Sequence, residues 1–235
     1  MAKDAGRARV RTVSEPDPEA PRVPRREPEG RTFQARFDWG RSLRGETGRS
    51  AWSTWSVAPD RPDPVDLLQS QSATRVPDLV PVRHARMLVS PFTFYRGGAL
   101  IMAADLARTP SSGIYVQACG DAHLSNFGAF ATPERRMAFD INDFDESHPA
   151  PFEWDVARLA ASVVVAADDN GFDRDTGRRI AQQAARRYRE QVRALSQQTF
   201  LDIWYSRVDF EGRVRQIETT YSRAEFKRAQ KAGRK

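Results

Sequence analysis

The sequence is poor in cysteine, with Cys119 as the only one in 235 residues. A single cysteine excludes an internal disulfide and is typical of proteins that stay in a reducing compartment, so we expect a cytoplasmic protein. Cys119 is next to a group of acidic residues, where it is either a nucleophile or a small buried residue. No histidine–asparagine arrangement of the kind found in cysteine enzymes accompanies it, which favours the buried residue.

Long apolar runs are also missing. No stretch reaches the roughly 18 apolar residues that a membrane-spanning helix needs, so we expect no membrane span. The longest apolar stretch, residues 160–167, fits a short helix. No apolar segment follows the basic residues near the N-terminus, and we therefore expect no secretory signal.

Histidine is scarce too, with three in the whole chain, and neither a zinc-finger spacing nor an RNP motif is visible. The net charge of +6 and the isoelectric point near 9.9 permit binding to acidic partners. Many of the arginines, however, are interleaved with proline and glutamate close to the N-terminus, away from any recognisable binding module. We therefore do not expect nucleic-acid binding.

Composition divides the chain into four parts. Residues 1–32 are rich in proline, arginine and glutamate and have few large apolar residues, which predicts a disordered basic tail. Residues 33–63 carry several aromatic side chains and are interpreted as an arm that docks onto the domain at points, with a base-stacking platform as the alternative. Residues 64–205 form the predicted catalytic domain, and residues 206–235 a charged, weakly patterned C-terminal segment.

Two β-prone runs, at residues 114–117 and 137–141, predict short strands. Helical patterns surround them, and Ser90 followed by Pro91 is a typical helix start. The predicted helices cover residues 64–71, 82–89, 152–167 and 174–195, with helix continuing over 196–205. Helices on both sides of a small sheet indicate an α+β fold that is mostly helical.

The chemistry is concentrated in residues 117–159. Asp121 and Asn126 follow the first predicted strand, and Asp143 follows the second, so strand ends lead directly into loops with functional groups. A carboxylate such as Asp121 can orient a hydroxyl group and accept its proton. The amide oxygen of Asn126 and the carboxylate of Asp143 are oxygen ligands that suit magnesium. This combination is typical of phosphoryl transfer, which depends on positioning and charge neutralisation.

Three motifs resemble small-molecule kinases of the aminoglycoside phosphotransferase and choline kinase type. Residues 120–126, GDAHLSN, resemble the catalytic loop, residues 142–145, NDFD, the metal-binding segment, and residues 154–160, WDVARLA, the helix that follows. Cys119 stands where those kinases usually carry histidine. The resemblance implies a protein-kinase-like catalytic lobe that uses ATP and Mg²⁺.

The same resemblance implies a role for individual residues. Asp121 would orient and deprotonate the acceptor hydroxyl, and Asn126 and Asp143 would hold magnesium. Asp145 would be a further ligand of the metal, and His123 would support the loop or contact the phosphate. Asp155, at the start of the following helix, would hold the catalytic loop through hydrogen bonds to its backbone.

A closer resemblance, over roughly residues 65–200, is to bacterial domain-of-unknown-function family 2252. It is carried by four motifs: SPFTFYRG at residues 90–97, CGDAHLSNFG at 119–128, NDFDE at 142–146 and PFEWD at 151–155. Members of that family carry a glycine-rich segment and a lysine after the acidic motifs. This chain contains neither, and we therefore expect an incomplete lobe, truncated on its C-terminal side.

Arg96, inside the SPFTFYRG motif, has two interpretations. It is a donor to a phosphate or to a catalytic carboxylate, or it forms a structural pair with an acidic residue such as Asp105. Two glycines follow it, an unusual feature in a helix, which would let another group approach closely.

Other functions stay open at this point. A metal-dependent hydrolase would use a transition metal held by histidine and carboxylate side chains, namely Asp121, His123, Asp143, Asp145 and His148. A non-catalytic binding module or pseudo-enzyme is favoured by the absence of the glycine-rich segment and the lysine. The acidic residues are also typical of turns and helix caps. The acceptor, whether a sugar, an amine or a protein, cannot be read from the sequence.

Overall fold

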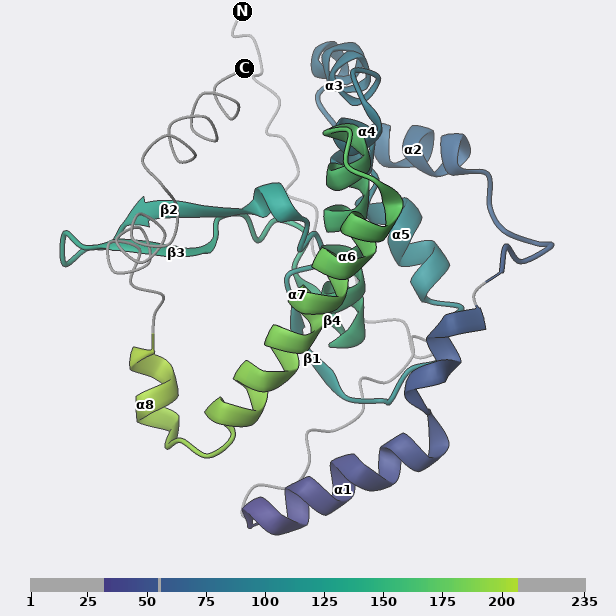
Figure 1. Cartoon of the computed structure of the whole chain (residues 1–235). Helices are drawn as coiled ribbons and strands as arrows, with labels where there is room; N and C mark the ends of the chain where they lie inside the picture. The colour runs from purple at the N-terminus through teal and green to yellow at the C-terminus, as the bar shows by residue number, and fades with distance from the viewer. Residues whose placement is uncertain (1–31, 55, 207–235) are drawn as a thin grey trace, which may run out of the picture.

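A computed structural model describes residues 32–54 and 56–206 of the chain. This part contains eight α-helices and four β-strands, so the α+β class predicted from the sequence is confirmed (Figure 1). The predicted tail 1–32 and the predicted segment 206–235 lie outside the described residues, apart from Thr32 and Ser206.

The aromatic arm is more helical than the sequence suggested. Helix α1 spans Phe33–Glu46, where the Thr32 side chain accepts a hydrogen bond from the Ala35 backbone, and a 3-10 helix, Arg49–Thr54, follows. The arm contacts the rest of the described chain. Thr47 donates a hydrogen bond to the Ser111 carbonyl oxygen, 64 residues further along the chain.

Four short helices follow, namely α2 (Pro64–Ser72), α3 (Val80–Met87), α4 (Pro91–Gly97) and α5 (Ala99–Leu106). Ser90 and Thr93 form a reciprocal capping box at the start of α4, with Pro91 in the first turn, as the sequence predicted. A β-carbon at Gly97 would collide with the Met87 side chain, so glycine lets α3 pack closely on α4. Leu68, Met87 and Ile101 form a buried core between these helices.

The strands form two antiparallel pairs. Strand β1 (Tyr115–Ala118) pairs with β4 (His148–Pro151), and β2 (Phe127–Ala131) pairs with β3 (Met137–Ile141), which forms a hairpin that projects from the helices in Figure 1. The sequence predicted β1 and β3 but missed β2 and β4. Strand β2 is built from small residues and phenylalanine, and β4 contains two prolines, which are tolerated because each strand of a two-stranded sheet has a free edge.

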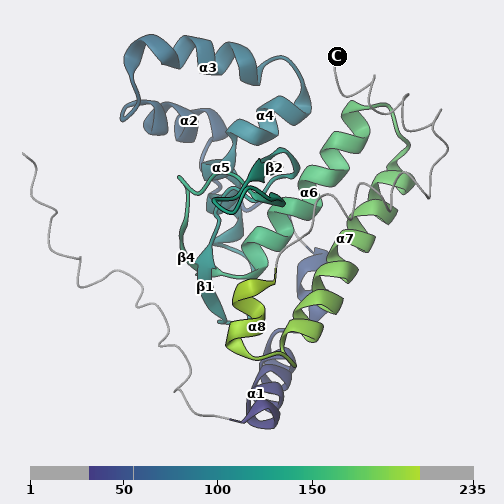
Figure 2. The ribbon, with the colours of Figure 1, turned by 90° about the vertical axis from the view of Figure 1, so that its left-hand side faces the viewer.

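A helical hairpin completes the described part. Helices α6 (Glu153–Asp169) and α7 (Arg174–Leu195) lie side by side in both views, joined by a turn in which Gly171 has φ +77° (Figures 1 and 2). The predicted core stripe of α7 is only partly buried, since Ile180 is 43% and Val192 46% exposed. The predicted continuation through 196–205 is wrong, because Thr199 caps a new helix, α8 (Phe200–Tyr205).

Helix α6 organises the surroundings of the acidic motifs. It contacts α4, α5, α7 and the 3-10 turn Leu124–Asn126 that lies between β1 and β2. The loops that leave β1 and β3 therefore meet residues of α4 and α6 that are distant in sequence. Within residues 32–54 and 56–206, no helix has the length and apolar character needed to cross a membrane.

Candidate active site

The loop that leaves β1 is held at its first residues by Asp155. This carboxylate, in the first turn of α6, accepts hydrogen bonds from the backbone N–H groups of Cys119 at 2.8 Å and Gly120 at 3.0 Å. The expectation that Asp155 anchors the loop through its backbone is confirmed. Cys119 is buried, and burial raises the pKa of its thiol, so it does not have the character of an activated nucleophile.

Gly120 is required at its position for two reasons. Its φ of +81° lies in the left-handed region, and a β-carbon there would overlap the carbonyl oxygen of Glu146. Gly171 is a matched comparison, since it has φ +77° but no atom near the position of a β-carbon.

We expect Gly171→Ala to lower the free energy of unfolding by about 1–2 kcal/mol, the cost of the left-handed backbone alone. Gly120→Ala should cost about 1–3 kcal/mol more, because the loop must also move away from Glu146. Urea-induced unfolding of both variants measures the difference. Equal costs would show that the contact with Glu146 is relaxed easily.

Asp121 is held by an arginine that the sequence analysis missed. Arg158 on α6 is 2% exposed, and its Nε and Nη2 atoms donate to Oδ1 of Asp121 at 2.8 and 2.6 Å. This leaves Oδ2 of Asp121 outside the arginine interaction. Arg158 lies one helical turn after Asp155, so both side chains are on the same face of α6. This spacing could have indicated that Arg158, like Asp155, contacts the loop after β1.

Tyr95 on α4 holds Arg158 from the other side. The guanidinium carbon lies 4.2 Å from the centroid of the Tyr95 ring, and Nη2 donates to the Tyr95 carbonyl oxygen at 2.8 Å. The Tyr95 hydroxyl donates to the Arg158 carbonyl oxygen at 2.8 Å. Burial raises the pKa of Tyr95 to about 12, so the hydroxyl keeps its proton for this bond. Asp121 is therefore oriented by α4 and α6 together.

His123 is neutral and packed beside Asp121. It is 6% exposed, and its Nε2 lies 3.5 Å from Oδ2 of Asp121. Burial lowers its pKa below the ordinary 6.5, although the charge of Asp121 opposes this shift. Its Nδ1 is buried without a hydrogen-bond partner among the residues that the structure describes.

The lowered pKa of His123 predicts a pH dependence of stability. In the unfolded chain His123 is protonated near pH 6.5, whereas in the folded chain its protonation requires a lower pH. The contribution of His123 to stability is therefore complete above pH 6.5 and is lost as the pH falls through the lowered folded-state pKa. We expect the thermal midpoint to decrease between about pH 7 and pH 5. His123→Gln should weaken this decrease in the same titration, and an unchanged slope would contradict the assignment.

Asn126 ties the two acidic loops together. It is 6% exposed, and its Nδ2 donates to the carbonyl oxygens of Asp121 at 3.1 Å and Asp143 at 3.0 Å. The backbone N–H of Asn142 in turn donates to the Asn126 carbonyl oxygen. Within the described ranges, Oδ1 of Asn126 accepts no hydrogen bond. The amide oxygen therefore has no described protein partner, while the side chain itself is buried and does not line the cleft.

The predicted magnesium ligands are only partly brought together. Asp121 and Asp143 line one cleft, whereas Asn126, which is buried, and Asp145 are not among its lining residues. The backbone N–H of Asp145 instead donates to Oδ1 of Asp143, as in a turn. An amide oxygen and a carboxylate oxygen match the ligands that magnesium prefers, so the chemistry of Asn126 and Asp143 fits this ion.

A transition-metal site has less support. In the described part of the chain, no three histidine, cysteine, aspartate or glutamate side chains are arranged to hold a metal ion together. His148, one of the ligands in the hydrolase hypothesis, has its Nδ1 2.9 Å from the Glu146 carbonyl oxygen, within a turn. Within the described residues, the five side chains of the hydrolase hypothesis therefore do not include a group of three arranged around one metal ion.

The cleft has a volume of about 730 Å³ and places Arg96 together with Asp121, His123 and Asp143. The alternative that Arg96 pairs with Asp105 is wrong, because Asp105 binds Arg61 through contacts of 2.6 and 2.8 Å. Sequence reasoning missed three more arginines of this cleft: Arg75, Arg83 and Arg86.

A family model described as "Uncharacterized protein conserved in bacteria (DUF2252)" matches residues 75–235, more than half of the chain. The chain belongs to this family. No curated protein and no solved structure matches the sequence of this chain. The DUF2252 match begins at Arg75 and includes Arg96, Asp121, His123 and Asp143, so these cleft residues lie within the family domain.

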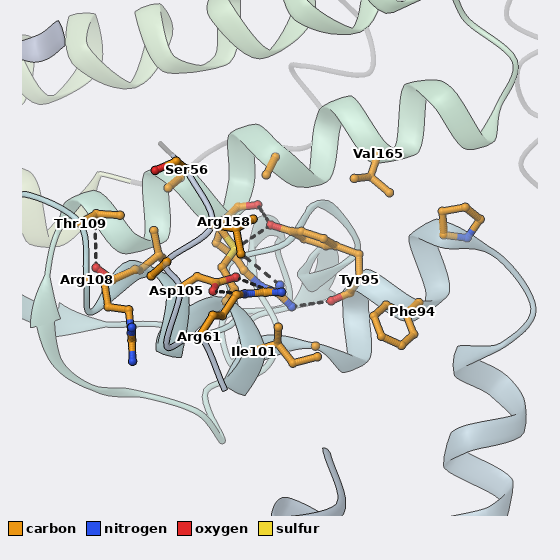
Figure 3. A pocket seen from close by; sticks show the side chains of 18 of the residues that line it. Ser56, Arg61, Phe94, Tyr95, Ile101, Asp105, Arg108, Thr109, Arg158 and Val165 are labelled. Atoms are coloured by element: carbon orange, nitrogen blue, oxygen red, sulfur yellow. Dashed lines mark hydrogen bonds and ion pairs between the residues drawn. The ribbon is translucent and has the colours of Figure 1, made fainter. Parts of the chain in front are cut away.

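A second, larger cavity has Arg158 in its lining and also includes residues of the arm, which precede the DUF2252 match. It measures about 1220 Å³ and is lined mainly by apolar side chains, among them Phe94, Ile101 and Val165 (Figure 3). Its buried charges are already paired, as with Arg61 and Asp105 in the same view. We assign the chemistry to the smaller cleft, because it contains Asp121 and the other residues of the acidic motifs.

Proposed function

We propose that this chain carries the catalytic loop of a phosphotransferase that uses ATP and Mg²⁺ and acts on a hydroxyl group of an unknown acceptor. One observation carries the proposal. Asp121 is held through Oδ1 by Arg158, which leaves Oδ2 outside the arginine interaction, in a cleft that also contains Asp143 and Arg96. A fixed carboxylate beside oxygen ligands and a cation is the arrangement that phosphoryl transfer needs.

Asp121 acts as the general base. Its Oδ2 accepts the proton of the acceptor hydroxyl, and Arg158 limits the carboxylate to one orientation. His123 is neutral and lies 3.5 Å from Oδ2, where it supports the position of the carboxylate.

Asn126 and Asp143 are the residues that would hold a magnesium ion. Asn126 uses its amide nitrogen to join the two loops, so its oxygen is oriented by the same contacts that connect Asp121 and Asp143. When bound, magnesium neutralises charge on the phosphate groups. Asp145 is assigned an indirect role, since its backbone N–H holds Oδ1 of Asp143.

The order of the elements supports a lobe of the protein-kinase type. The loop with Asp121 follows β1, the hairpin β2–β3 leads to Asp143, and α6 then returns to anchor the first loop through Asp155. This is the order of the motifs in aminoglycoside phosphotransferases, which the sequence resembles.

Calorimetric titration with ATP tests the proposal. Wild-type protein should bind ATP in the presence of magnesium and lose most of its affinity when EDTA is added. Asp143→Asn should show the same loss with magnesium present, since an amide is a weaker ligand for this ion. Release of ADP with a panel of sugars, amino alcohols and proteins then identifies the acceptor. ATP affinity that is independent of magnesium would contradict the assigned ligands.

A further inference from the structure

The cleft of Asp121 contains four arginines, and the mechanism above uses only Arg96 among them, as a cation near Asp121. Arg75 follows α2, Arg83 and Arg86 lie on α3, and Arg96 is on α4. We call these four residues the arginine wall. Arg83 and Arg86 are three positions apart, which places them on the same face of α3.

We infer that the arginine wall binds a chain of two or three phosphate groups next to Asp121. The inference rests on the proposed function, because it places the phosphate-bearing ligand in the same cleft as the general base. The arginine wall is then the part of the site that recognises the phosphate groups of the ligand.

Protein groups compensate the charge of the arginine wall only in part. The guanidinium groups of Arg86 and Arg96 have no hydrogen bond or ion pair with any described residue. Arg75 makes one long contact, 3.9 Å, with Glu146. Two of the wall's four positive charges thus lack any described protein partner.

Arg83 is the most restrained member of the wall. Its Nη2 donates to the Gly97 carbonyl oxygen at 2.7 Å and to the Gln71 side chain at 3.2 Å, while Nη1 is buried without a partner in the described part. Burial lowers its pKa, and the charge of Arg75 adds to this shift. An anion beside Arg83 would supply the missing partner and relieve the repulsion between the two arginines.

The acidic residues of the cleft do not restore the balance. Of the two acidic lining residues, Asp121 is already paired with the buried Arg158, so Asp143 is the only other carboxylate among the described lining residues. A single phosphate monoester carries about −1.5 to −2 at neutral pH, which is less than the charge of the wall. One such group would balance the two unpartnered arginines, so the preference for a longer chain of phosphates rests on the spread of the four arginines over α3, α4 and the segment after α2.

The donors suit an oxyanion, and a phosphate group carries more negative charge than a carboxylate. The planar guanidinium group presents parallel N–H donors that fit two phosphate oxygens at once. A cleft of about 730 Å³ has the size of a small-molecule site. A nucleoside triphosphate and an inorganic polyphosphate share this chemistry, and the experiment separates them.

Calorimetry with tripolyphosphate, ATP and adenosine tests the inference. A variant that combines Arg86→Gln and Arg96→Gln should bind tripolyphosphate and ATP at least tenfold more weakly than wild type. Its unfolding transition should be unchanged, because both side chains are exposed. The matched control combines Arg178→Gln and Arg187→Gln, which removes the same charge from exposed positions on α7. The control should change both affinities by less than about twofold, since surface charges far from the site are screened.

The possible outcomes separate this inference from the proposed function. Asp121→Asn should keep its affinity for tripolyphosphate. If wild-type protein binds tripolyphosphate through the arginines but releases no ADP with any acceptor, the arginine wall is supported and the phosphotransferase is rejected. The wall is rejected if the Arg86/Arg96 variant binds as tightly as the control, or if wild-type protein binds neither tripolyphosphate nor ATP. ATP binding without tripolyphosphate binding also rejects it, since the nucleoside would then provide the affinity.

Discussion

Replacing Arg158 with methionine is expected to lower the free energy of unfolding by about 3–5 kcal/mol, the usual effect of breaking a buried ion pair. The Arg158 side chain is 3% exposed and that of Asp121 is 20% exposed, so solvent replaces little of the lost interaction. Methionine fills much of the volume but leaves the Asp121 carboxylate and the Tyr95 carbonyl oxygen without their donors. Urea-induced unfolding measures the loss.

A double-mutant cycle separates the ion pair from the packing of the side chain. Asp121→Leu added to Arg158→Met should recover part of the stability, because the uncompensated carboxylate is removed with its partner. Arg187→Met, at an exposed position of α7, should stay within about 0.5 kcal/mol of wild type. A cost below about 1 kcal/mol for Arg158→Met would show that water or another group replaces the arginine.

Asp121→Asn is expected to reduce phosphoryl transfer by about 10²–10⁴-fold, the range that a general base contributes. Asparagine keeps an oxygen that can accept from Arg158, so the loop should stay in place. Its amide nitrogen replaces Oδ2 and cannot accept a proton. Steady-state release of ADP at saturating ATP and acceptor measures the loss, and calorimetry should show an unchanged affinity for tripolyphosphate.

Asp168→Asn serves as the matched control, because it makes the same chemical change at an exposed position near the end of α6. Its turnover should equal that of wild type. If Asp121→Asn retained turnover within about threefold of this control, the assignment of Asp121 as general base would be rejected.

The sequence predicted the local parts of the site correctly. Helix α7 and strand β3 have the predicted bounds, the capping box at Ser90 forms, and Asp155 anchors the loop at Cys119 and Gly120. These features depend on residues a few positions apart or on motifs that resemble a known family. Periodicity and capping preferences act at this range, so they are readable without the fold.

Two strands were missed for a related reason. Strand β4, with the sequence HPAP, has no β-propensity of its own and becomes a strand because it pairs with β1, more than thirty residues earlier in the chain. Pairing between distant segments overrides local preference in such cases. No secondary structure was predicted for the arm, where Thr32 supplies a helix cap for α1.

What the sequence by itself determined is the set of chemical groups near the site: the acidic motifs, their position after strands, and the helix that follows. Only the tertiary structure decided which groups meet. Tyr95 and Arg158 are 63 residues apart, and Arg158 and Asp121 are 37 apart. The arginine wall likewise forms only when α3 and α4 pack beside the loop of Asp121. Such contacts depend on how helices pack, and no periodic pattern along the chain encodes that packing.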